Sequence, residues 1–235
     1  HVLKTGGIYN DDKDVPRMFI NGKDTPLASN GNTQHYRAGD RVVYDVNGDG
    51  VVNSDDRVYA GAPAPIAQGG IITSLEWKGF DLNVLFNFVI SRHILNAARG
   101  ASVGTIIGLT PDDSVTPVYV DLNNVSFWQK PGDKTDFPMN RLEGGLGSFN
   151  SYTTANVENV SYIKLKTFSI GYTLPERWKK KVGFGLRVFV SGENLFTVTN
   201  YSGADPESVN IMTGVDNLGN YPLNRKLTLG ITAIF

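Results

Sequence analysis

The stretch GFDLNVLFNFVIS, residues 79–91, decides the fold class of this chain. Its even-numbered positions form one wholly apolar face, made of Phe80, Leu82, Val84, Phe86, Phe88 and Ile90. Its odd-numbered positions are mixed in polarity and include Asp81, Asn83 and Asn87. Alternation with a period of two predicts a β-strand whose two faces meet different surroundings.

Four more segments alternate in the same way, so the sequence predicts five strands. They are expected at 67–77, 79–91, 160–173, 183–197 and 225–235. The links between them differ greatly in length: Lys78–Gly79 predicts a tight hairpin and 174–182 a short turn, whereas 92–159 and 198–224 are long. Long connections are uncommon inside a compact soluble domain. A transmembrane β-barrel, in contrast, combines short periplasmic turns with long extracellular loops.

All of these links agree with one orientation in a membrane. If the last strand descends to the periplasm, both short links fall on the periplasmic side and both long loops fall outside. We therefore expect an all-β fold, the C-terminal portion of a large antiparallel transmembrane β-barrel, with an extracellular loop region at 1–66 and barrel strands in 67–235. The competing prediction is a soluble, calcium-stabilised β-sandwich that binds carbohydrate. A sandwich would bury the apolar strand faces that a barrel turns to lipid.

The last strand carries a candidate signal for barrel assembly. A polar residue, a glycine, an apolar residue and a terminal aromatic follow one another at Thr228, Gly230, Ala233 and Phe235. We interpret this pattern as the strand edge that barrel-assembly machinery reads. An ordinary amphipathic last strand is the alternative interpretation.

Residues 45–56, DVNGDGVVNSDD, have nearly the spacing of a calcium-binding loop. The expected ligands are the side chains of Asp45, Asn47, Asp49, Asn53 and Asp56 and the carbonyl of Val51. Gly50 stands where such a loop turns, and Val52 is expected to pack inward. A calcium sensor needs a helix on each side of its loop, which Pro63 and Pro65 prevent. Two predictions stay open: a structural Ca²⁺, or a turn that holds no ion.

Composition excludes several function classes. The chain has 235 residues, a net charge of −1 and no cysteine, which argues against a nucleic-acid partner, disulfides and cysteine-based metal sites. It contains no apolar run long enough for a transmembrane helix. The three histidines are far apart and no G-x-S-x-G motif occurs, so we expect no enzyme. Because the chain opens on His1 without a start-like context, we expect a piece of a longer polypeptide.

Five motifs, in order, resemble the C-terminal barrel region of SusC/RagA-type TonB-dependent outer-membrane receptors. They are YDVNGDGVVNSDDRVYAG (44–61), LEWKGFDLNVLF (75–86), NVSYIKLKTFSIGYTLP (159–175), LRVFVSGENLFTVTNYSGADPE (186–207) and YPLNRKLTLGITAIF (221–235). The chain departs from the family pattern at Lys164, where arginine is common, and at Ala204, where an aromatic residue is common.

The resemblance implies import of glycans or peptides across the outer membrane of a Gram-negative bacterium. Receptors of this family form barrels of about 22 strands, closed by an N-terminal plug and energised through TonB. They act with a SusD-like surface lipoprotein that captures the cargo and forms a lid. The resemblance therefore implies that this chain's partners are the rest of the barrel with its plug, the lipoprotein, the TonB system and outer-membrane lipid.

Overall fold

The computed structural model describes residues 1–20, 22–29, 34–97, 99, 126–135, 137–139, 152–217 and 221–234. The chain forms two compact units. One unit comprises His1–Gly61, Leu95–Glu158 and Val215–Gly219, and the other comprises Ala62–Ile94, Asn159–Gly214 and Asn220–Phe235. The sequence-based division at residue 66 thus differs from this grouping, in which described residues such as 95–97 and 152–158 belong with the N-terminal residues.

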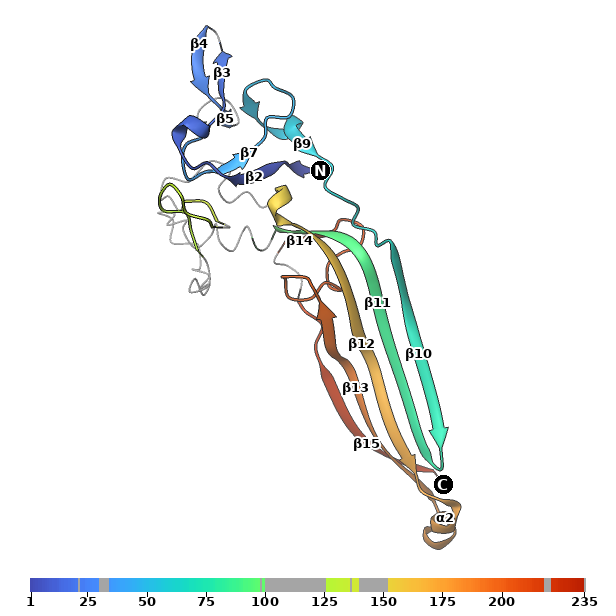
Figure 1. The fold of residues 1–235 in the computed structure, drawn as a ribbon. Helices are drawn as coiled ribbons and strands as arrows, with labels where there is room; N and C mark the ends of the chain where they lie inside the picture. Colours follow the sequence, from blue (N-terminus) through green and yellow to red (C-terminus); the bar gives the residue numbers. More distant parts are fainter. Residues whose placement is uncertain are drawn as a thin grey trace, which may run out of the picture. The chain divides into compact units, whose positions relative to one another are not determined.

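The second unit is built on a sheet of long strands in the order β10-β11-β12-β13-β15 (Figure 1). The strands span Ala67–Trp77 (β10), Phe80–Asn96 (β11), Val157–Thr173 (β12), Gly185–Thr199 (β13) and Lys226–Ile234 (β15). The pairs β10–β11, β12–β13 and β13–β15 are antiparallel. Each of the five predicted strands is therefore present, because alternation of side-chain polarity is a local property that the sequence carries directly.

The two short connections have well-defined local causes. Between β10 and β11, Lys78 and Gly79 both have positive φ angles, 48° and 88°, as a two-residue hairpin turn with the right twist requires. Between β12 and β13, the chain forms a short helix, α2, at Glu176–Val182, where the sequence predicted only a turn. Gly183 ends this helix in the left-handed conformation, and its N–H donates to the Lys179 carbonyl at 2.8 Å.

One face of the sheet consists of exposed apolar side chains. The set includes Ile71, Leu75, Trp77, Phe80, Ile90, Ile170, Val188, Leu227, Leu229 and Ile231. Leu229 is 74% exposed and Ile71 is 54% exposed, although both stand in the middle of their strands. A continuous apolar surface of this kind marks contact with lipid or with another apolar surface.

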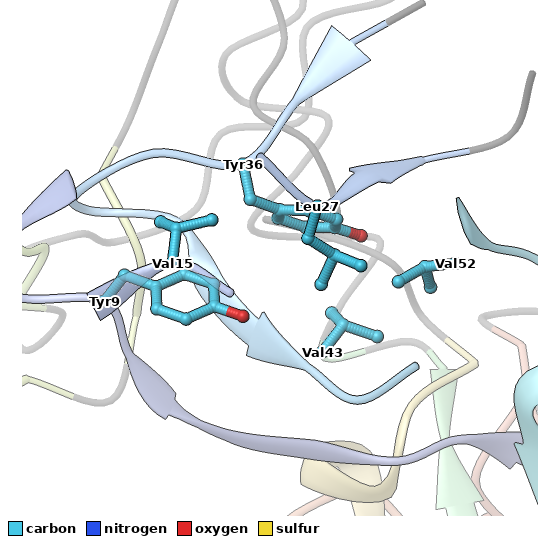
Figure 2. Close-up of a cluster of buried hydrophobic side chains, with 6 residues drawn as sticks. All are labelled: Tyr9, Val15, Leu27, Tyr36, Val43 and Val52. Carbon is cyan, nitrogen blue, oxygen red and sulfur yellow. The ribbon is translucent and has the colours of Figure 1, made fainter. Parts of the chain in front are cut away.

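The first unit is made of small sheets around a compact core. Its strands are β1 (Val2–Leu3), β2 (Thr5–Ile8), β3 (Arg17–Ile20), β4 (Lys23–Pro26), β5 (Ala28–Ser29), β6 (Gln34–His35), β7 (Arg41–Val43), β8 (Val51–Val52), β9 (Arg57–Val58) and β14 (Val215–Asp216). Its described residues also form short 3-10 helices at Asp12–Asp14, Ser54–Asp56 and Thr154–Asn156. The core cluster brings together Tyr9, Val15, Leu27, Tyr36, Val43 and Val52 (Figure 2). Val52 therefore packs inward, as predicted.

Across the described residues, no helix combines the length and the hydrophobicity that a membrane span would need.

Candidate functional site: a loop anchored on the polar face of the sheet

The two faces of β12 can be told apart at Ile163 and Lys164. Ile163 pairs with Val198 of β13, and both side chains are exposed. Both also line a shallow apolar depression together with Phe88 and Ile90 of β11. Successive residues of a strand point to opposite faces. Lys164 therefore points to the face opposite the exposed apolar one, which we call the polar face.

Lys164 is buried there by the loop 200–214, called the anchored loop below. Its side chain is only 2% exposed, and its Nζ atom lies 2.8 Å from Asp205 Oδ2 and 2.8 Å from Glu207 Oε2. Lys166, two residues along the same strand, places its Nζ atom 2.9 Å from Glu207 Oε1. Two ammonium groups thus face two carboxylates. Because a buried charge without a partner is costly, this network holds the loop against the strand.

The backbone around Asp205 fixes the carboxylate in place. Asp205 Oδ1 accepts a hydrogen bond from the Glu207 N–H at 3.0 Å, and Oδ2 accepts one from the Leu223 N–H at 3.3 Å. The Ser208 hydroxyl donates to the Asp205 carbonyl at 2.8 Å. Burial alone raises the pKa of the Asp205 carboxyl. The Lys164 ammonium and the two backbone N–H groups lower it by a larger amount, so the pKa lies below the ordinary value.

A second buried cation holds the end of the anchored loop. Arg92 of β11 is 3% exposed, and its guanidinium donates to the carbonyls of Pro63 at 3.1 Å, Val209 at 3.3 Å and Asn210 at 3.1 Å. The planar guanidinium suits this task because its donors spread in fixed directions. Arg92 therefore ties three backbone segments together through main-chain oxygens.

Apolar packing completes the attachment of the anchored loop. Tyr201 and Val209 from the loop form a buried cluster with Ile94 of β11 and Val160 of β12. Both loop residues are less than 10% exposed. Ion pairs, main-chain hydrogen bonds and a small apolar core thus act together, so the loop has one preferred position on the sheet.

An ion pair also crosses the sheet near the β10–β11 hairpin. Arg187 of β13 donates from Nε to Asp81 Oδ1 of β11 at 2.9 Å, and its Nη2 atom contacts Asp81 Oδ2. The strand between them carries Gly171, where a Cβ atom would meet the Arg187 guanidinium and the Asp81 carboxylate. Glycine is therefore required at this position for the pair to form across β12.

Three residues of the candidate assembly signal, Thr228, Gly230 and Ala233, lie on β15. Thr228 pairs with Ser191 and Ala233 pairs with Leu186, both on β13. Gly230 lies opposite Phe189, whose ring occupies the space that a side chain would need. Gly230 therefore has a packing reason of its own. Phe235 lies outside the described residues, and the assembly role of the four residues stays a prediction.

The predicted calcium loop folds as a series of side-chain-capped turns. The Asp45 carboxylate accepts hydrogen bonds from the N–H groups of Gly48 and Gly50, each at 2.7 Å. Asp56 is fully buried and accepts from the N–H groups of Val46, at 2.7 Å, and Asn53, at 2.8 Å. Asp45 and Asp56 thus tie the two ends of the loop to its own backbone.

The remaining predicted ligands of this loop bond mainly to one another and to nearby backbone. Asn47 Oδ1 accepts from the Asp49 N–H at 3.0 Å, Asp49 Oδ1 from the Val51 N–H at 2.8 Å, and Asn53 Oδ1 from the Asp55 N–H at 2.7 Å. In the part of the chain that the structure describes, no three acidic or histidine side chains gather as a metal site. The carboxylates of the loop therefore do not converge as a set of metal ligands, and calcium binding stays a prediction.

The sequence did not reveal that Lys164 and Asp205 are partners, although it drew attention to both regions. The available signal was a pair of lysines two apart on one strand face, Lys164 and Lys166, and a pair of acids two apart in a loop, Asp205 and Glu207. Both pairs have the same spacing and opposite charge. That similarity predicts a contact only when the loop is known to fold back on that strand.

Comparison with known proteins identifies the chain's relatives. No protein-family model matches it. The chain is 31% identical over 207 residues to the TonB-dependent receptor P3 of Formosa agariphila, and 23% identical over 203 residues to the TonB-dependent receptor SusC of Bacteroides thetaiotaomicron. These alignments cover 84% and 83% of this chain but 19% and 18% of the relatives, so the chain spans about a fifth of their length.

Solved structures show the same fold. A structure of the RagAB peptide importer in the closed-closed state matches with a TM-score of 0.59 at 23% identity, covering 99% of this chain and 22% of the other. A second RagAB structure, of the peptide transporter, matches with a TM-score of 0.57 at 24% identity, with the same coverage. The expected all-β barrel fold and the resemblance to SusC/RagA receptors are thereby confirmed. This chain belongs to the SusC/RagA-type TonB-dependent receptors, of whose β-barrel it forms a part.

Proposed function

We propose that this chain is the C-terminal section of the barrel wall of an outer-membrane importer in a Gram-negative bacterium. The observation that carries the proposal is the contrast between the two faces of the sheet. One face exposes large apolar side chains such as Leu229 and Ile71, and the other carries Asp81, Arg187 and the buried Lys164. A barrel in a bilayer has this division, with apolar residues toward lipid and polar residues toward the lumen.

The proposal also explains the edges of the sheet. Within the described residues, β10 and β15 each pair with a long strand on one side only. Unpaired backbone groups at an open edge are not tolerated in hydrocarbon. We therefore expect both edges to pair with strands from the rest of the receptor, which also supplies the plug and the segment that contacts TonB.

The proposed mechanism is gated import without a catalytic step. The polar face would line the passage, and the anchored loop, lying on that face, would be a fixed part of its wall. The cargo would be a glycan or a peptide, captured by a SusD-like surface lipoprotein that covers the barrel. The support for this part is the kinship with SusC and the fold shared with RagAB, which is described as a peptide importer.

We further propose that the loop 45–56 takes a structural Ca²⁺. Support comes from the spacing of its oxygen-bearing residues and from the positive φ angles of Gly48 and Gly50, 79° and 85°, which shape the turn. The side chains of Asn47 and Asp49 would have to rotate toward the ion, since they now bond within the loop. The ion would stiffen an extracellular loop and would take no part in chemistry.

Single-cysteine labelling tests the barrel proposal in a complete receptor whose other segments have been made free of cysteine; this chain itself has none. Adjacent residues of β15, Ile231 and Thr232, point to opposite faces. In intact outer membranes we expect a water-soluble maleimide to label Thr232→Cys and to leave Ile231→Cys unlabelled until the membrane is dissolved. Equal labelling of the two variants, or recovery of the receptor in the soluble fraction, would overturn the barrel proposal and favour the soluble sandwich.

A further inference from the structure

One end of the sheet carries a concentration of exposed cations. They lie on the β10–β11 hairpin and on α2, and they are Lys78, Arg177, Lys179, Lys180 and Lys181, together called the basic rim. In the part of the chain that the structure describes, none of the five forms an ion pair with a carboxylate. Lys164 and Lys166 of the same unit, in contrast, are neutralised by Asp205 and Glu207.

The basic rim is one continuous feature because the hairpin and α2 are neighbours (Figure 1). The Thr173 N–H at the end of β12 donates to the Gly79 carbonyl of the hairpin at 2.7 Å. The chain enters α2 three residues later, at Glu176. The charges of the two connections therefore act on the same region of space.

Charge at this end differs in sign from the charge of the whole chain. The five cations are accompanied by two exposed carboxylates, Glu76 and Glu176, which leaves an excess of positive charge. The complete chain has a net charge of −1. The basic rim therefore produces a local positive electrostatic potential, which favours binding to a surface that carries many negative charges.

Aromatic residues lie beside and within the basic rim, and we call them the aromatic border. Trp77 is 67% exposed and Trp178, within α2, is 49% exposed, and the rings of Phe80 and Tyr172 contact each other at a tilt with centroids 4.5 Å apart. Lys78 Nζ lies 4.8 Å from the centre of the Trp77 ring. Exposed tryptophan side chains favour the headgroup level of a bilayer, where an apolar ring and a polar N–H are both satisfied. Basic residues next to such a border meet lipid phosphates.

We infer that the basic rim binds the headgroups of anionic phospholipids in the adjoining membrane leaflet. This inference rests on the proposed barrel function, which brings the rim to the periplasmic interface. The aromatic border sets the depth of the sheet in the membrane, and the basic rim adds electrostatic attraction to the phosphates just beyond it. Attraction of this kind grows with the number of basic residues and weakens as salt is added.

The test is native mass spectrometry of the complete receptor in detergent, titrated with dioleoyl phosphatidylglycerol or with dioleoyl phosphatidylcholine. We expect the wild-type receptor to retain phosphatidylglycerol in preference to phosphatidylcholine. The variant K179Q/K180Q/K181Q should bind phosphatidylglycerol at least about tenfold more weakly, because three charges are lost. The matched control K4Q/K13Q/K23Q removes three lysines from the first unit and should bind as the wild type does.

Each outcome separates this inference from the barrel proposal. A receptor that is found in the outer membrane but binds phosphatidylglycerol equally in wild type and K179Q/K180Q/K181Q would overturn the lipid inference alone. Equal loss in the control variant would also overturn it, because the effect would then follow total charge. A receptor absent from the membrane fraction would overturn the barrel proposal itself, before any lipid is added.

Discussion

Lys164 of β12 and Asp205 of the anchored loop form an ion pair in which both side chains are buried. Their Nζ and Oδ2 atoms are 2.8 Å apart, with side chains 2% and 8% exposed, and the residues are 41 positions apart in the sequence. Burial removes water from both charges, so each needs an oppositely charged partner, and Lys164 has a second one in Glu207. The pair therefore acts with the Glu207 ion pairs, the Arg92 hydrogen bonds and the apolar cluster in fixing the position of the loop on the sheet.

Asp205→Asn should loosen the anchored loop. The substitution keeps the shape of the side chain but leaves Lys164 with Glu207 as its remaining carboxylate. Breaking a buried pair costs about 3–5 kcal/mol of stability. Because Glu207 still neutralises Lys164, we expect a cost of about 3 kcal/mol. Hydrogen exchange of residues 200–214 in the purified receptor measures this as faster exchange of backbone amides.

The control for that experiment is Glu193→Gln. Glu193 faces Lys226 at 3.7 Å across β13 and β15, but both side chains are more than half exposed. An exposed pair contributes about 0–1 kcal/mol, so exchange in the anchored loop should not change. If Asp205→Asn leaves the loop as protected as Glu193→Gln does, the buried pair does not hold it.

Acid should release the anchored loop. The pKa of Asp205 is lower in the folded protein than in the unfolded chain, so its contribution to stability is complete above the unfolded pKa of about 4. That contribution is lost as the pH falls through the lower, folded pKa. We expect the protection of residues 200–214 to be constant from neutral pH down to about pH 5 and to fall below about pH 4. Loss of protection between pH 6 and 7 would show that another group controls the loop.

Gly171→Val should weaken the sheet by separating Arg187 from Asp81. The added side chain would occupy the space where the guanidinium and the carboxylate meet above Gly171. Overpacking at such a position costs about 1–3 kcal/mol, in addition to the disturbed ion pair. The temperature at which the receptor unfolds in detergent gels should fall. Gly185→Ala is the matched control, because its Cβ would lie 3.5 Å from Ile234, an ordinary contact.

Calcium should bind the loop 45–56 of the complete receptor with an affinity on the order of 10⁻⁴ to 10⁻³ M, as in other extracellular calcium modules. Asp49→Asn should remove this binding, because it takes a negative charge from the fifth position of the loop. Asp24→Asn, which alters an exposed carboxylate on β4, should not. Isothermal titration calorimetry provides the measurement. An unchanged heat of calcium binding in Asp49→Asn would assign the ion to another site, and no heat in the wild type would favour the turn that holds no ion.

The sequence by itself determined the five long strands, the hairpin at Lys78–Gly79 and the family. These depend on local information: alternation fixes which residues share a face, and a short turn sequence fixes the hairpin. The helix α2 was not predicted, because seven residues between two strands are too few for a helical period to stand out. The strands of the first unit, two to four residues long, gave no period either.

Only the tertiary structure decided which side chains meet. Arg187 and Asp81 are 106 residues apart and pair only because β11, β12 and β13 are neighbours with glycine at position 171. The same holds for Lys164 and Asp205, whose pairing requires that the loop 200–214 folds back on the polar face of β12. Charge and spacing identify candidates for such contacts. Strand order, register and the path of a loop select among them, because they alone bring distant charges within the few ångströms at which a buried ion pair is stable.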